Sequence, residues 1–425
     1  MPGTGTAADA LRRTLTRRDA VFIGMGSMIG AGMFVVWSPA AQAAGSWMLL
    51  SVLIVAVVAA CNAYSSAMLA ARYPSAGGTY VYGTERLGQL PGFLAGWCFI
   101  IGKSASCVAM ALTLGAYVAP GYERLAAVVA VLAVTAANLS GLQRSARISA
   151  VIVAVVLAVL VGLGVSVAVA SMAGEPVFDL RTGLGSMTDA SAYGVLQAAG
   201  LLFFAFAGYA RIATLGEEVL DPERTIGQAI GITFVVVLAL YSGLAVLVLG
   251  VIGSDAAAAS VAPIADVAEQ VWGQQWVWSV RVAAACAALG ALLNMLLGIS
   301  RTTLAMARDA HLPTRLASVS GPHQLPQRAE VAVASVVLLV ALVVDLRGAI
   351  GFSSFGVLLY YAVANASAWS LRGDKLWQRI VPVTGLVGCL VLVAALPWES
   401  VLAGLVLVGL GIGWYAGTHR ARMAG

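Results

Sequence analysis

The sequence predicts an all-α membrane protein of about twelve transmembrane helices. Of the 425 residues, 60% are hydrophobic and only 10% are charged, and the mean hydropathy is +0.93. A water-soluble domain carries about a quarter charged residues, so this chain cannot cover a water-facing surface. Inside lipid, only helices and closed barrels satisfy the backbone. The ten-residue alternation of a membrane barrel does not occur along the chain, which indicates helices.

Twelve apolar runs are long enough to cross a bilayer, which requires about 20 mostly apolar residues. Short polar turns separate most of them, and no connecting segment is long enough for a soluble domain. The runs lie near residues 20–44, 46–70, 92–118, 122–139, 146–171, 193–216, 227–252, 274–300, 329–345, 349–371, 380–396 and 400–417.

Lysine and arginine are distributed unequally between the two sides of the predicted helices. With the N-terminus inside, nineteen of them fall on the cytoplasmic side, and four (Arg124, Arg181, Arg281 and Arg347) fall outside. Cytoplasmic segments of membrane proteins carry such an excess. We therefore expect the N-terminal arm (residues 1–19) and the tail (residues 418–425) in the cytoplasm, and the chain in the inner (plasma) membrane. The net charge of +5 follows from this asymmetry and needs no nucleic-acid partner.

The first predicted helix contains four glycines, Gly24, Gly26, Gly30 and Gly32. Each glycine costs about 1 kcal/mol against alanine in a helix, and these lie roughly 10–18 Å deep, close to the midplane. Irregular backbone at that depth is tolerated where it lines a cavity or is packed in protein. Two interpretations stay open: a discontinuous helix whose free amides and carbonyls bind a ligand, or close helix packing through small residues.

The sixth predicted helix is interrupted in a similar way. Three phenylalanines, Phe203, Phe204 and Phe206, precede the lone Gly208 well inside the span. Helices 1 and 6 are the first members of two five-helix halves, and paired interruptions at corresponding positions are typical of a binding site between inverted repeats. The pairing favours the discontinuous-helix interpretation.

At these residues the chain resembles the amino acid–polyamine–organocation superfamily of permeases. The resemblance covers residues 17–372 and keeps the order and spacing of four motifs. These motifs are Gly26–Phe34; Phe204–Tyr209 followed by Glu217-Glu218-Val219 and Asp221-Pro222; Ser300-Arg301 through Leu312-Pro313; and Phe352–Gly356 through Asn365-Ala366-Ser367.

The resemblance implies the LeuT-type fold, with a first five-helix repeat over residues 20–171, a second over 193–371 and two additional helices over 380–417. It also implies alternating access around a midplane site. Carried over by position, one group of residues would hold the substrate carboxylate and part of the amine: Ser27, Met28, Ile29, Gly30, Ala31 and Gly32. A second group would supply carbonyls to the amine and cover the side chain: Phe204, Ala205, Phe206 and Gly208, with Phe206 or Tyr209 as an aromatic gate.

The chain departs from the family pattern at two positions. Many relatives carry an acidic residue where this chain has Ala210, and some proton-coupled relatives carry a lysine in helix 5 where this chain has Val156. The coupling scheme that uses a helix 5 lysine is therefore not expected here.

One full charge, Lys103, lies inside the third predicted helix, roughly 15 Å deep. An ionisable residue at that depth costs about 2.5 kcal/mol or more and is a functional candidate. A desolvated lysine titrates readily, which suits proton coupling. Other interpretations stay open: Lys103 mimics a sodium ion, contacts a substrate carboxyl, or snorkels toward the interface.

Other polar residues suggest smaller roles. Glu217 and Glu218, near Arg211, are candidates for a cytoplasmic gate, with a solvated surface pair as the alternative. Ser300, Thr302 and Thr303 place hydroxyls near a sodium-type site, but no carboxylate accompanies them, and back-bonding within their helix is the alternative. Cysteine and histidine spacing indicates no metal site, and we expect no cofactor.

The sequence therefore predicts a secondary transporter that takes amino acids or closely related amines from one side of the bilayer to the other, with protons as the expected coupling ion. The aromatic pocket and Lys103 favour neutral amino acids over cationic ones or polyamines, and exchange or export stays an alternative to uptake. An embedded enzyme would need a nucleophile–base or metal set within the spans, and a channel a repeated polar stripe; neither occurs. The sequence gives no oligomeric state.

Overall fold

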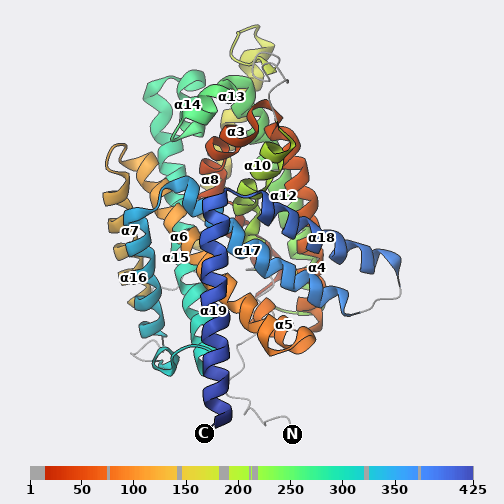
Figure 1. Cartoon of the computed structure of the whole chain (residues 1–425). Coiled ribbons are helices and arrows are strands. Elements are labelled where there is room, and N and C mark those ends of the chain that lie inside the picture. Colours follow the sequence, from red (N-terminus) through yellow and green to blue (C-terminus); the bar gives the residue numbers. More distant parts are fainter. Residues whose placement is uncertain are drawn as a thin grey trace.

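The computed structural model describes residues 15–73, 77–140, 146–180, 191–209, 212, 219–319, 325–371 and 375–424, with side chains left out for 146–149 and 419–424. Every named element in these ranges is a helix (Figure 1). Apolar side chains recur along each long helix, and the backbone bonds within its own segment, as lipid requires. The all-α prediction is confirmed.

The first half of the chain opens with a helix in pieces and continues with long helices. Its elements are α1 (Arg17–Met28), α2 (Gly32–Val35), α3 (Trp37–Ala44), the 3₁₀ turn η1 (Gly45–Trp47), α4 (Met48–Arg72), α5 (Thr79–Leu87), α6 (Gln89–Val118), α7 (Glu123–Leu139) and α8 (Ala146–Met172).

The second half repeats the pattern of an interrupted helix followed by long ones. Its elements are α10 (Ala192–Phe206), the 3₁₀ turn η2 (Ala207–Tyr209), α12 (Pro222–Val251), α13 (Gly253–Ala259), α14 (Pro263–Trp272), η3 (Gln274–Trp276), α15 (Val277–Arg308), η4 (Thr314–Ala317), α16 (Gln327–Val343), α17 (Leu346–Trp369), α18 (Leu376–Ala395) and α19 (Trp398–Ala424).

Ten helical stretches among the described residues are long and apolar enough to cross a membrane. Two further helices, α7 and α16, have 17 residues each, about 25 Å at 1.5 Å per residue, which is the short end of the spanning range. They coincide with two of the predicted spans. With α7 and α16 included, each of the twelve predicted runs corresponds to a helix or to an interrupted helix. The sixth run, residues 193–216, is described up to residue 209 and at residue 212.

Three short helices were not predicted. α5 follows α4, whereas α13 and α14 lie at the end of the molecule opposite the C-terminal end of α19 (Figure 1), where α13 packs against α3. Gln42 Nε2 donates to the Ala258 carbonyl at 2.8 Å and ties α3 to α13. Segments of seven to ten residues are too short for the periodic pattern that identifies a spanning helix.

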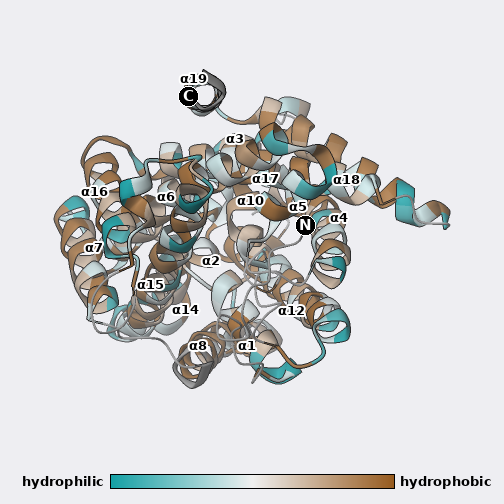
Figure 2. Cartoon of the chain, turned by 90° about the horizontal axis from the view of Figure 1, so that it is seen from below, coloured by the Kyte–Doolittle hydropathy of each residue, from teal (hydrophilic) through white to brown (hydrophobic). Residues whose placement is uncertain are grey.

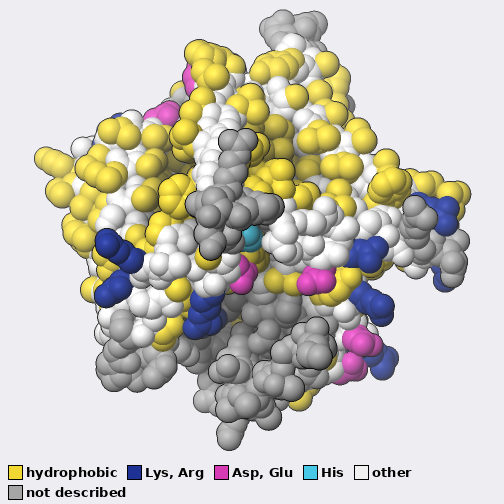
Figure 3. Space-filling view, turned by 60° about the horizontal axis from the view of Figure 1, so that its bottom comes forward, with side chains coloured by type: hydrophobic (Ala, Val, Ile, Leu, Met, Phe, Trp, Pro, Cys, Tyr) yellow, Lys and Arg dark blue, Asp and Glu magenta, His cyan; other side chains and the backbone are white. Residues whose placement is uncertain are grey.

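The outer faces of the helices are hydrophobic, which is the reverse of a water-soluble protein. Large apolar side chains are exposed along α8, where Val151, Val161, Val165 and Val169 are each more than half exposed. In Figure 2 hydrophobic residues cover the outward faces of α7, α15 and α16. Figure 3 shows Lys and Arg side chains around the rim of one end and hydrophobic side chains on the flanks. Lipid contact accounts for this distribution, because a bilayer does not penalise exposed apolar area.

The long helix α6 is the centre of the packing. It has 30 residues and contacts α17, α15, α5 and α7. At its crossing with α17 the two backbones approach closely, since a Cβ on Gly356 would lie 2.7 Å from the Gly102 Cα. Small residues at such crossings let helices pack without a hydrophobic driving force. This contact fixes the positions of the α6 and α17 side chains that surround the interrupted helices.

We expect Gly356→Val to destabilise the α6–α17 crossing, because the added side chain overlaps backbone rather than a movable side chain. Overpacking of this kind costs about 1–3 kcal/mol. The measurement is the thermal unfolding midpoint of the purified protein in detergent, which should fall by several degrees. The matched control is Gly409→Val on α19, where an added Cβ meets no atom within 4 Å. Equal midpoints for the two variants would contradict the prediction.

Candidate functional site

The first helix is discontinuous, as the glycine pattern predicts. α1 ends at Met28, and α2 begins at Gly32. Between them Ile29 has φ −81° and ψ 59°, which is not helical. Among the described residues, the amides of Gly30, Ala31 and Gly32 donate no hydrogen bond. The segment therefore presents free backbone donors inside the protein.

The second interruption lies in α10. The helix ends at Phe206 and continues as the 3₁₀ turn η2. The last carbonyls of a helix have no donor ahead of them in the same helix. Ala205 and Phe206 belong to this last turn, so their carbonyls accept from the following 3₁₀ turn or from other helices.

The two interruptions contact each other through glycine. A Cβ on Gly208 would lie 2.4 Å from the Ser27 carbonyl oxygen, and a Cβ on Gly32 would lie 2.9 Å from the Ala205 Cα. Both neighbours are backbone and cannot move aside as a flexible side chain can. The glycines are therefore consistent with both interpretations left open by the sequence. They interrupt the helices, and they also allow the two interrupted segments to pack in contact.

Tyr241 of α12 joins the two interruptions directly. Its hydroxyl donates to the Met28 carbonyl at 2.7 Å and to the Ala205 carbonyl at 3.1 Å. The sequence analysis did not single out this residue. The available signal was a lone tyrosine in the middle of an apolar span, because a buried tyrosine hydroxyl needs a hydrogen-bond partner.

Lys103 reaches the second interruption from α6. Its side chain is only 4% exposed, and Nζ donates to the Ala207 carbonyl at 3.2 Å. The Tyr361 hydroxyl of α17 donates to the same carbonyl at 3.3 Å. The snorkelling interpretation is wrong, because Lys103 lies near the middle of α6 and bonds inside the protein. Among the described residues no carboxylate forms an ion pair with Nζ.

The charge of Lys103 is placed where a helix is electronegative. The carbonyl end of α10 carries about half a negative charge from its aligned peptide dipoles. An ammonium bonded just beyond this end interacts favourably with it. Because the partner is a neutral carbonyl and not a carboxylate, the bond does not compensate the full charge.

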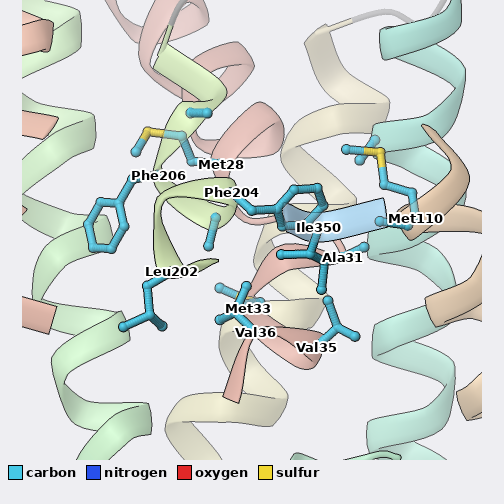
Figure 4. Close-up of a cluster of buried hydrophobic side chains, with 14 of the residues drawn as sticks. Met28, Ala31, Met33, Val35, Val36, Met110, Leu202, Phe204, Phe206 and Ile350 are labelled. Atoms are coloured by element: carbon cyan, nitrogen blue, oxygen red, sulfur yellow. The ribbon is translucent and has the colours of Figure 1, made fainter. Parts of the chain in front are cut away.

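An apolar cluster lies beside the interruptions. Figure 4 shows Phe204 next to Ile350 and Ala31, with Met110 of α6 behind them, whereas Phe206 points to the other side of α10. Phe206 packs edge-on against Tyr241, with ring centroids 4.9 Å apart. Phe204 therefore faces the side shared by α1, α6 and α17.

The gate candidates from the sequence have different surroundings. Phe206 is held against α12, and Tyr209 packs against Tyr361 with ring centroids 5.0 Å apart. Both are almost fully buried. The gate candidates Arg211, Glu217 and Glu218 lie outside the described residues, as does Ala210.

The hydroxyls near the expected sodium-type position bond within their own helix. Ser300 donates to the Leu296 carbonyl at 2.8 Å, and Thr302 to the Gly298 carbonyl at 3.2 Å. This is the back-bonding pattern of serine and threonine in helices. The Thr303 hydroxyl is buried and has no hydrogen-bond partner among the described residues.

The interruptions are closed to the surface. Residues 28–32 and 204–209 are all buried. Two cavities of about 510 and 600 Å³ open instead on the flanks, one between α4 and α12 and the other between α8 and α12. No residue of either interruption lines them.

Comparison with known proteins identifies the family. The profile described as amino acid permease matches residues 15–412, nearly the whole chain. The chain belongs to the amino acid permease family. It is thus a transporter and not an enzyme, and its many apolar helices make it a multi-pass membrane protein.

Several relatives are similar over most of this permease. Uncharacterized transporters of Mycobacterium bovis and Mycobacterium tuberculosis are 54% identical over 420 residues, 97% of this chain and 94% of theirs. A branched-chain amino acid permease of Bacillus subtilis is 26% identical over 95% of this chain and 92% of its own. A vacuolar cationic amino acid transporter of Arabidopsis thaliana is 29% identical over 85% of this chain and 60% of its own.

We expect Gly208→Ala to reduce uptake roughly tenfold or more, because the methyl group pushes the two interruptions apart and small misplacements in a binding site are costly. The measurement is uptake of the labelled amino acid that the wild type carries. Gly231→Ala on α12 is the matched control, since an added Cβ there meets no atom within 4 Å. Wild-type uptake by Gly208→Ala would show that the contact is not needed.

Proposed function

We propose that this permease carries amino acids across the membrane by alternating access, with the substrate bound between the two interruptions. The observation that carries the proposal is the contact of two broken helices at Ser27–Gly208, with unpaired amides on one side and helix-end carbonyls on the other. Free backbone groups of opposite polarity match the carboxylate and the ammonium of an amino acid.

Each end of the substrate has a distinct partner. The amides of Gly30, Ala31 and Gly32 bind the carboxylate, because they have no other acceptor among the described residues. The carbonyls of Met28 and Ala205 bind the ammonium. Ser27, Ile29 and the segment Phe204–Gly208 complete the wall, and the interruptions belong to two repeats that we place at residues 20–171 and 193–371, followed by two additional helices at 380–417.

A neutral side chain is the favoured cargo. The side chains near Phe204 are apolar (Ala31, Met110 and Ile350; Figure 4), and within the described part of the chain no acidic side chain accompanies them to receive a cation. Lys103 repels a cationic side chain at the inner end of the site. The name of the Bacillus subtilis relative agrees with an apolar cargo, whereas the names of the Arabidopsis relatives favour the second candidate, a cationic amino acid or polyamine.

Lys103 is the proposed proton-coupling residue. Among the described residues it is the basic side chain bonded to an interruption, and its partner is a neutral carbonyl. A buried amine in such a site exchanges its proton at modest cost, unlike an ammonium held by a carboxylate. Amino acid exchange or export without a proton gradient is the alternative.

We place the chain in the plasma membrane with both termini in the cytoplasm. The support is the excess of Lys and Arg on that side of the predicted helices. The gate formed by Glu217, Glu218 and Arg211 is proposed at the same side from the position of these charges at the inner end of the sixth predicted helix.

The proposed cargo predicts selective uptake into proteoliposomes. We expect labelled L-leucine to enter in a saturable way and faster than L-arginine or putrescine, because the wall near Phe204 is apolar. An inward proton gradient should raise the rate. Preference for arginine or putrescine would instead support the second candidate, and transport of none of the three would refute the proposed function.

The proposed coupling predicts that Lys103→Ala abolishes the stimulation of leucine uptake by an inward proton gradient. Leucine exchange without a gradient should persist in this variant. The matched control is Lys375→Ala, because Lys375 is the other lysine of the sequence and is exposed at the start of α18. Gradient stimulation that survives Lys103→Ala would make Lys103 a structural charge.

A further inference from the structure

The Tyr241 hydroxyl bonds to backbone from both interruptions at once. We propose that it takes the place of the substrate ammonium in the empty carrier, so that the carrier can return without cargo. The inference rests on the proposed function and assigns Tyr241 a role in net transport rather than in substrate exchange.

The two carbonyls that Tyr241 bonds lie at the broken ends of helices and have no hydrogen-bond donor within their own helix. Met28 is the last residue of α1, and the amide that would bond its carbonyl in a continuous helix, that of Gly32, belongs to α2. Ala205 lies in the last turn of α10. Each carbonyl therefore needs a donor from outside its own helix.

These carbonyls belong to residues that are shielded from bulk water in the closed structure. Met28 and Ala205 are 1% and 5% exposed, and Tyr241 itself is 1% exposed. A buried carbonyl without a donor loses the full free energy of its hydration. Among the described residues, Tyr241 is the side chain that donates to both.

The hydroxyl is held in place while its hydrogen stays free to turn. The Tyr241 ring packs edge-on against Phe206 at 4.9 Å and against Trp37 at 6.2 Å between centroids. These contacts fix the oxygen between the two acceptors. The hydroxyl has one hydrogen and each carbonyl has two lone pairs, so a substrate ammonium can take the free positions while the hydroxyl turns toward either oxygen.

Removal of the hydroxyl affects the empty and loaded carriers unequally. In the loaded carrier the ammonium of the substrate still bonds the two carbonyls. In the empty, closed carrier the carbonyl that had accepted the hydroxyl hydrogen is left without that donor, and this state becomes less stable. Net uptake requires the empty carrier to turn its binding site back to the outer side of the membrane. In exchange, the carrier has substrate bound in both directions.

The test is Tyr241→Phe in proteoliposomes with labelled L-leucine as the probe. Net uptake into vesicles without internal leucine should fall roughly tenfold, the effect of one unsatisfied buried group. Exchange against internal unlabelled leucine should stay within about twofold of wild type. The half-saturating leucine concentration should fall roughly threefold, because the empty state that competes with binding is destabilised.

Tyr117→Phe is the matched control. The Tyr117 hydroxyl donates to the Phe34 carbonyl at 2.8 Å and is equally buried, but Phe34 lies within α2 and not at an interruption. The ratio of net uptake to exchange should therefore equal that of wild type in this variant.

Three results would overturn the inference. One is a parallel fall of net uptake and exchange in Tyr241→Phe, which a purely structural hydrogen bond gives. Another is a higher half-saturating leucine concentration in Tyr241→Phe than in wild type, which means that the hydroxyl only holds the site in its binding conformation. The third is a wild type without net uptake, since an obligate exchanger never returns empty. A wild type that carries neither leucine nor arginine refutes the proposed function itself.

Discussion

The structure depends on one constraint: a helix broken inside a membrane leaves backbone carbonyls without a donor in their own helix, and lipid offers them no hydrogen bond. The interruptions in α1 and α10 are both buried, and their carbonyls receive hydrogen bonds from side chains of three other helices. Tyr241 comes from α12, Lys103 from α6 and Tyr361 from α17. Each donor has to be held at the right distance by its own helix. The packing around the site is therefore the means by which irregular backbone at this depth is made stable.

The same donors explain why the scaffold is built from close helix contacts. Lys103 and Tyr361 bond one carbonyl from two helices, which requires α6 and α17 to keep a fixed separation. The crossing of Gly102 with Gly356 provides it, because the two backbones touch there. Polar pairs add to the contact, as in the Ser106–Ser353 hydroxyl pair at 2.6 Å. A loosened crossing would move both donors away from Ala207, and the free energy of the interruption would rise although no residue of the interruption had changed.

The sequence predicts the interruptions but not their partners. The glycine cluster in helix 1 and the lone Gly208 in helix 6 are local signals, since the cost of a glycine in a helix depends on the residue itself, and the structure places both breaks near these residues. The depth of Lys103 also follows from counting residues along one helix. Its bond to Ala207 does not, because the two residues are 104 positions apart and meet through the packing of helices. Tyr241 and Met28 are 213 positions apart. Short helices such as α13 lack the periodicity that identifies long ones. The gate candidates Arg211, Glu217 and Glu218 lie outside the described residues.

The positions of the donors also bear on how transport is coupled to charge. Lys103 bonds the Ala207 carbonyl, and the proposed ammonium site includes the Ala205 carbonyl of the same helix end. Two cations at one helix end repel each other, and the dipole of that end attracts both. In the proposed site, the carboxylate of the substrate is bound by the amides of Gly30–Gly32 on the other interruption and has the opposite effect on Lys103. The sign of the coupling therefore follows from which charged group of the substrate lies closer to Nζ: a nearer carboxylate favours a protonated Lys103 in the loaded carrier, and a nearer ammonium favours proton release on binding.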